Sequence, residues 1–207
     1  MPRNYNDQTK ITVDFGWLDN IQENTAKFSE LKTAGFDASS IASKAKIILA
    51  PGYQMVRSDI DDMAFELALL CESTKEVVYY IKCQVWGDVY LNAKPITQVL
   101  LWRTSNVVHR RITSGLAEDI FRGYLLDEYN IVASDSCQTR EGRDFWVRQL
   151  GYALQFGEFV YRFDRLNCEL LQITDHATVR DNSCDLWGDE QEYENILAMI
   201  SKDEIIL

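Results

Sequence analysis

The chain has 207 residues and a net charge of −11, and 46% of its residues are hydrophobic. This composition excludes wholesale disorder, because enough apolar surface is present to build a sizeable core. The negative charge argues against direct binding to nucleic-acid backbones, which requires a basic surface.

Membrane, secretion and metal-binding signals are missing from the sequence. No apolar run approaches the roughly 20 residues of a spanning helix, and the first residues, MPRNYNDQTK, contain no apolar signal core. The five cysteines are widely spaced, without a CxxC motif or a Cys/His cluster, which predicts neither a disulfide framework nor a metal site. We therefore expect a soluble, cytoplasmic protein with no membrane association, folded as a single domain over residues 1–207.

The N-terminal half is predicted to begin with a strand and a helix, both within residues 1–45. Residues 10–15 alternate apolar and polar side chains, as a half-buried strand does. Asp19 is the predicted N-cap of a helix that runs to about Lys32, and Gly35 then ends it. Residues 59–71 are predicted to be helical, because their apolar residues recur on one helical face.

The remaining predicted elements are five strands and three helices. Strands are predicted where β-branched and aromatic residues concentrate, and helices where apolar residues recur at helical spacing. The predicted strands are 77–86, 96–108, 130–134, 158–163 and 169–174, and the predicted helices are 115–129, 139–156 and 190–201. This order predicts an α+β protein with a mixed sheet flanked by helices.

The clearest candidate binding motif is HRRITSGLA at residues 109–117, between a predicted strand and a predicted helix. Free backbone amides, the positive end of the helix dipole, Arg110 and Arg111 converge there, which favours binding of phosphate or pyrophosphate. The alternative is that Ser114 simply caps the helix and both arginines are solvated.

Signals for a nucleophile are weak. The sequence has no GxSxG, Walker, GxGxxG or HExxH motif. His109 and His176 have no partner at a motif spacing, so we interpret both as structural. Cys137 follows a predicted strand, where a nucleophile could lie, but a buried thiol is the favoured interpretation.

The order strand, Gly-x-Ala at a helix start, helix, strand, helix, strand resembles the core of GCN5-related N-acetyltransferases. A second motif is similar to a divergent phage and prophage subgroup of that family, and it consists of Ser134-Asp135, Gln138-Thr139, Gly142 and Trp146. The tail, Asp185-Leu186-Trp187 followed by an amphipathic helix ending near residue 201, is also similar. The resemblance covers about residues 96–207.

The resemblance implies a twisted, mostly antiparallel mixed sheet whose middle strands splay apart to hold acetyl-CoA or another acyl-CoA. Residues 96–174 would form the core of this cofactor site. The implied cofactor-binding residues are Arg110, Arg111, Thr113, Ser114, Gly115, Leu116, Ala117 and Gln138, with the pyrophosphate on the amides from Thr113 to Ala117. A small-molecule or protein amine would attack the thioester directly, and the protein would supply positioning and a base.

Two departures from the family pattern concern the phosphate loop and the proton donor. Ile112 occupies the first slot of the loop, and Arg111 lies one residue early. Phe145-Trp146 stands where the family often has a tyrosine acid, and Trp146 is interpreted as core packing. Tyr152 and Tyr161 are the candidate substitutes for that tyrosine.

Asp135 is the candidate catalytic base or substrate contact, although a carboxylate in this position also caps a following helix. Residues 185–207, which include the predicted C-terminal helix, contain seven acidic residues and one lysine. A solvated face explains this charge, and an acidic surface for a protein partner is the alternative. Three functions follow as hypotheses: an acyltransferase, a non-catalytic phage accessory or virion protein of the same fold, and an acidic inhibitor of a DNA-binding enzyme.

Overall fold

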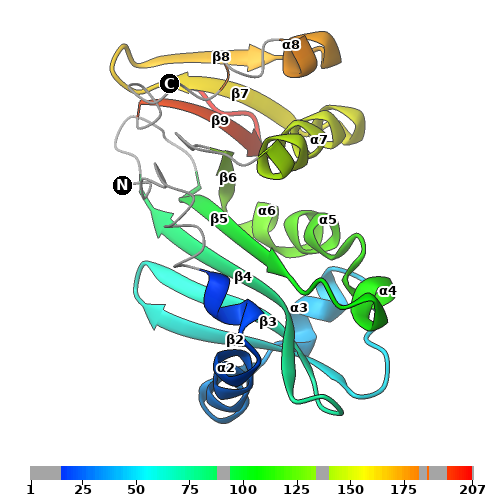
Figure 1. Ribbon diagram of the computed structural model, residues 1–207. Helices are drawn as coiled ribbons and strands as arrows, with labels where there is room; N and C mark the ends of the chain where they lie inside the picture. Colours follow the sequence, from blue (N-terminus) through cyan, green and yellow to red (C-terminus); the bar gives the residue numbers. More distant parts are fainter. Residues whose placement is uncertain (1–14, 88–93, 134–139, 182–185, 187–194, 207) are drawn as a thin grey trace. The chain divides into compact units, whose positions relative to one another are not determined.

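The computed structural model describes residues 15–87, 94–133, 140–181, 186 and 195–206. The chain divides into two compact units. Of the described residues, those up to Val85 and from Val99 to Asp127 form the N-terminal unit, and those of Trp86–Gln98 and from Glu128 onward form the C-terminal unit. Each unit contributes part of a sheet and its own helices (Figure 1).

The sheet of the N-terminal unit contains strands that pair antiparallel in chain order from β1 to β4, with β5 next in the order. These strands are β1 (Phe36–Asp37), β2 (Tyr53–Asp61), β3 (Ala64–Cys71), β4 (Glu76–Trp86) and β5 (Ile96–Arg103). The helices are α2 (Ile21–Ala34), α3 (Ser39–Lys44), η1 (Val107–His109), α4 (Arg110–Thr113), α5 (Leu116–Ile120), η2 (Phe121–Leu125) and α6 (Leu126–Glu128).

Helix α2 packs on one face of this sheet, where Phe28 and Leu31 join a buried cluster with Val56 and Leu70 (Figure 1). Successive strand residues point to opposite faces, so Arg57, next to Val56, lies on the other face. That face carries α3 and η2, which also contact each other. Helices therefore cover both faces of the N-terminal sheet.

Buried Asn24 fastens α2 to the sheet. Its side-chain oxygen accepts a hydrogen bond from the Val77 amide at 2.7 Å, and its amide group donates to the carbonyls of Val77 at 3.0 Å and Leu18 at 2.9 Å. Asn20 caps α2 by accepting from the amides of Gln22 and Glu23. The predicted helix is thus confirmed, with its cap one residue after Asp19.

The predicted helix at 59–71 is wrong. Residues 59–61 end β2, a turn follows in which the Met63 amide donates to Asp61, and the rest forms β3. Seven of the eight β3 residues are buried, because helices cover both faces of the sheet. A strand that is apolar on both faces has no alternation, so its sequence also fits a helical period.

The C-terminal unit contains the first residues of β5 and four further strands in the spatial order β5-β6-β9-β7-β8. Strand β5 pairs parallel with β6, through Ile96–Gln98, and every other pair is antiparallel. The additional elements are β6 (Asn130–Ala133), α7 (Arg140–Phe156), β7 (Phe159–Asp164), β8 (Glu169–Ile173), α8 (His176–Asp181) and β9 (Ile196–Ser201).

The predicted C-terminal helix at 190–201 is wrong where the structure describes it. Strand β9 is placed between β6 and β7, and all six of its residues are buried. Its sequence, ILAMIS, is apolar up to Ser201 and suits a central strand as well as a buried helix. The acidic residues from 187 to 194, and most of the predicted strand at 10–15, lie outside the described residues. Phe15, the end of that predicted strand, is helical.

The other predicted elements are confirmed with shifted ends. Helix α7 ends before Gly157, whose φ of 77° is the left-handed conformation favoured after a helix. The strand predicted at 96–108 ends at Arg103, and Asn106 then caps η1 by accepting from the Val108 amide. The protein belongs to the α+β class with a mixed, mostly antiparallel sheet flanked by helices. Among the described helices, none combines the length and apolar character needed to cross a membrane.

Candidate anion-binding turn

The HRRITSGLA motif forms a turn within the N-terminal unit, between β5 and α5. Gly115 has φ of 77° and precedes the first residue of α5, a backbone conformation that glycine adopts without strain. No side chain caps α5. The amides of Leu116 and Ala117 have no intrahelical acceptor, because the first amides of any helix lack one. The turn therefore places backbone donors beside a pair of arginines.

The side chains of the motif divide by exposure. Arg110, Arg111, Ser114 and Gly115 are exposed, and Thr113, Leu116 and Ala117 are buried. The Thr113 hydroxyl donates to the His109 carbonyl at 3.1 Å, so this hydroxyl stabilises α4. Of the predicted binding side chains, the two arginines and Ser114 are therefore the ones presented to solvent.

Acidic residues follow immediately, because Glu118 and Asp119 lie in the first turn of α5. Desolvation, followed by the charge of Glu118, raises the pKa of Asp119, while Arg122 acts in the opposite direction. These carboxylates stabilise the positive end of the helix dipole. They also oppose an incoming anion, so the arginines have to outweigh them.

His109 anchors the turn to the sheet. Its side chain is 1% exposed; Nδ1 lies 2.8 Å from the Tyr53 hydroxyl and Nε2 lies 3.3 Å from a carboxylate oxygen of Glu76. One tautomer satisfies both bonds, with Nε2–H donating to Glu76 and Nδ1 accepting from Tyr53. The arrangement agrees with a structural role for this histidine and fixes the start of α4 against β2 and β4.

A thiol lies in the same cluster. Cys71 is opposite Tyr53 in the β2–β3 pairing and opposite Glu76 in the β3–β4 pairing. Burial raises the pKa of Cys71, but hydrogen bonds from Ser73 and Thr74 outweigh it and lower the pKa overall. Burial and the neighbouring Cys71 raise the pKa of Tyr53. Cys71 is only 2% exposed, so its thiol is closed to large substrates.

Sequence reasoning missed Tyr53 and Glu76 as partners of His109. They are 56 and 33 positions away along the chain, and neither belongs to a motif. Cross-strand register alone brings them together with Cys71. No local signal predicts such a register, because it depends on how β2, β3 and β4 pair.

The remaining predicted residues are distributed elsewhere. Asp135 and Gln138 lie outside the described residues, and Tyr152 is exposed on α7 in the C-terminal unit. The Tyr161 hydroxyl accepts from the Ile205 amide at 3.0 Å. Trp146 is buried and contacts Phe145 edge-on at 5.4 Å between ring centroids, which agrees with core packing.

Among the described residues, no group of three or more His, Cys, Asp or Glu side chains could hold a metal ion. Cys71, Cys83 and Cys168 are free thiols. Comparison with models of known protein families gives no match, and comparison with curated proteins gives none either. The resemblance to GCN5-related N-acetyltransferases stays a hypothesis.

Proposed function

We propose that this protein is an acyl-CoA-dependent N-acyltransferase with a fold like that of the GCN5-related N-acetyltransferases. The observation that carries the proposal is the path of the chain around the turn. Strand β5 leads through η1 and α4 to the amides at Gly115–Ala117, the helix α5–α6 follows, and β6 returns parallel to β5. Binding sites for phosphate groups commonly lie at a helix N-terminus that follows the carboxyl end of a strand.

The pyrophosphate of the cofactor would accept hydrogen bonds from the amides of Leu116 and Ala117, and Arg110 and Arg111 would neutralise its charge. In the reaction, the nitrogen of a neutral amine attacks the thioester carbonyl. An amide bond forms, the carbon–sulfur bond breaks, and coenzyme A leaves as a thiol. Asp135 is the proposed acceptor of the ammonium proton, and Tyr152 is the proposed donor to the leaving thiolate.

Thermal unfolding with and without acetyl-CoA tests the binding step. A ligand that binds only the folded state stabilises it by about 2.7 kcal/mol at a hundred times its Kd, so a rise in melting temperature is expected. The double variant Arg110→Ala/Arg111→Ala should lose most of this rise. Arg180→Ala is the matched control, because Arg180 is an exposed arginine on α8 in the C-terminal unit. An unchanged melting temperature at millimolar acetyl-CoA would refute the proposal.

A non-catalytic protein with the same fold is the second candidate, and the turn itself favours it. Ile112 stands in the first loop slot, Thr113 uses its hydroxyl within α4, and two carboxylates follow Gly115. Coenzyme A thiol release in the presence of an amine, above a control without amine, distinguishes the two. Acetyl-CoA binding without thiol release for any amine in a broad panel would favour the non-catalytic protein.

A further inference from the structure

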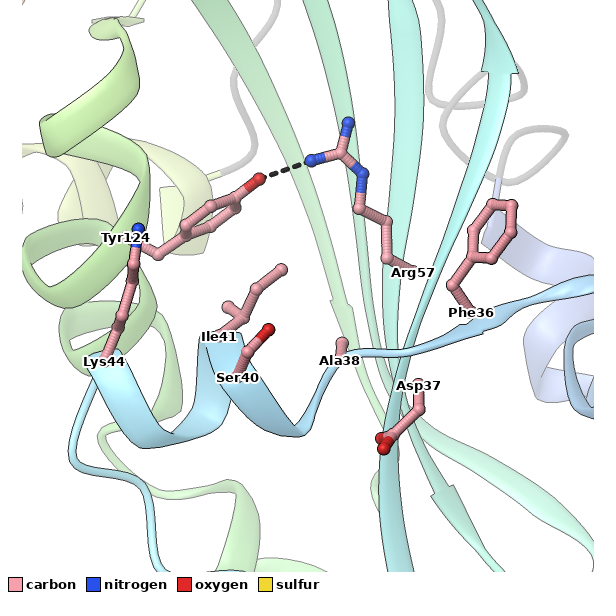
Figure 2. A pocket seen from close by; sticks show the side chains of 8 residues that line it. All are labelled: Phe36, Asp37, Ala38, Ser40, Ile41, Lys44, Arg57 and Tyr124. Carbon is pink, nitrogen blue, oxygen red and sulfur yellow. Dashed lines mark hydrogen bonds between the residues drawn. The ribbon is translucent and has the colours of Figure 1, made fainter.

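A pocket of about 290 Å³ lies on the face of the N-terminal sheet that carries Arg57, and none of the residues from Arg110 to Ala117 lines it (Figure 2). It is bordered by residues of β1, α3, β2 and η2. The side chains that shape it are Phe36, Ser40, Ile41, Lys44, Arg57 and Tyr124. Its volume is near the lower limit of roughly 300–1,000 Å³ for small-molecule sites, so it suits a ligand much smaller than coenzyme A.

Close helix packing builds one wall of the pocket. A Cβ added to Gly123 would lie 2.2 Å from the Cα of Ala45, which directly follows α3, so η2 and α3 are in backbone contact. Phe121–Leu125 is a π-helical segment. Such segments are rare in proteins, and those that occur are often found at functional sites. Tyr124, within it, points across the pocket toward Arg57 (Figure 2).

Arg57 is held in place from several sides. Its Nε lies 2.8 Å from a carboxylate oxygen of Asp59, Nη1 donates to the Tyr124 hydroxyl, and the guanidinium lies 4.1 Å from the Phe65 ring centroid. A guanidinium presents five donors in one plane, so it can bond several acceptors at the same time. Such prior ordering lowers the entropy cost of binding.

The lining is rich in donors and poor in acceptors. Lys44 extends on the same side as Tyr124, and the Ser40 hydroxyl faces the interior (Figure 2). Asp37 is the acidic member of the lining, but its carboxylate accepts from the Ser39 amide and hydroxyl, both at 3.0 Å. Figure 2 shows this carboxylate turned away from Arg57. The polar groups that face inward therefore favour an anion.

We infer that this pocket binds a small organic carboxylate. The planar guanidinium of Arg57 matches the geometry of a carboxylate. Tyr124 and Ser40 donate further hydrogen bonds, and Lys44 supplies the second positive charge. The apolar body of the ligand lies against Ile41 and the exposed ring of Phe36. This site is independent of the proposed acyl-CoA site, because it uses none of the residues from Arg110 to Ala117.

Benzoate, its neutral analogue benzamide, and inorganic phosphate are the probes that test the inference. Each is titrated into the full-length protein and followed by two-dimensional ¹H–¹⁵N NMR. We expect saturable shifts with benzoate at the Arg57 side-chain Nε–H and at residues 38–44, and none with benzamide. Shifts with phosphate alone, or equal shifts with benzoate and benzamide, would overturn the carboxylate assignment.

Variants distinguish a specific carboxylate site from nonspecific attraction of the benzoate anion to positive charge. Lys44→Met keeps the aliphatic stem and should weaken benzoate binding about tenfold, the effect of losing one charge-assisted contact. Arg57→Lys keeps the charge but loses the planar fork, and should weaken it at least as much. Arg180→Met should bind as the wild type does. Equal affinity for benzoate in all variants, with unchanged melting temperatures, would refute the site. This outcome does not depend on whether acetyl-CoA binds.

Discussion

Replacing Lys27 by methionine tests the energetics of a buried ion pair in the N-terminal unit. Lys27 Nζ lies 2.8 Å from Glu66 and 2.7 Å from Glu30. The Glu66 side chain is 8% exposed, and its other oxygen accepts from the Tyr80 hydroxyl at 2.5 Å. Without Lys27, the Glu66 carboxylate stays buried with Tyr80 as its one remaining partner among these residues. The expected loss is about 3–5 kcal/mol, the usual cost of removing one partner of a buried pair.

The same substitution changes the pH dependence of stability. Burial acts to lower the pKa of Lys27, but hydrogen bonds to Glu30 and Glu66 outweigh it and raise the pKa above 10.5. A folded-state pKa above the unfolded one stabilises the protein fully below the unfolded pKa, and this stabilisation is lost as pH rises through the folded pKa. The difference between wild type and Lys27→Met should therefore be constant near neutral pH and shrink above about pH 10.5.

Urea unfolding followed by circular dichroism measures both effects, with Glu66→Leu and the double variant completing the cycle. The double variant should recover most of the loss from Lys27→Met, because an apolar pair replaces the ion pair and no charge stays buried. Tyr80 then loses its hydrogen bond to Glu66, at a cost of about 1 kcal/mol. A loss below about 1 kcal/mol for Lys27→Met alone would refute the reasoning, because it would mean that Glu66 is solvated.

Three further predictions concern packing, the His109 cluster and acid stability. Gly123→Ala should destabilise by about 1–3 kcal/mol in urea, because its methyl would lie 2.2 Å from a backbone atom of α3's C-cap; Gly87→Ala, with nothing within 4 Å, is the control. Tyr53→Phe should cost about 1–3 kcal/mol, because buried His109 loses a partner; an unchanged unfolding midpoint would contradict this. Hydrogen bonds from the Asn167 amide and side chain lower the pKa of Asp164, so its stabilisation is present above about pH 3.9 and is lost in more acidic solution. Asp164→Asn should therefore flatten the acid limb of a stability–pH curve; an identical limb would exclude this role.

The sequence by itself determined the elements whose signals are local. Helix α2 is delimited by Asn20 and Gly35, and α7 ends just before Gly157, so capping chemistry within a few residues marks these helices. Strand β4 is rich in β-branched and aromatic residues along its whole length. The candidate anion-binding turn was visible for the same reason, because its glycine, hydroxyls and arginines are contiguous.

Tertiary structure alone decided the two mostly apolar segments that are buried on both faces. Strands β3 and β9 are central strands with nearly every residue buried, and their sequences carry no alternation that would distinguish them from a helix. Neighbouring strands on both sides decide that these segments form strands and not helices. A ladder of backbone hydrogen bonds to those neighbours satisfies the polar groups of a buried strand.

The same physical reason explains why the clusters around His109 and Arg57 were not predicted. The first depends on the register that sets Tyr53 opposite Cys71 and Cys71 opposite Glu76. The second depends on the packing of η2 against α3, which brings Tyr124 to Arg57. Local sequence encodes caps, turns and periods, whereas contacts between distant residues follow only from the pairing and packing of whole elements.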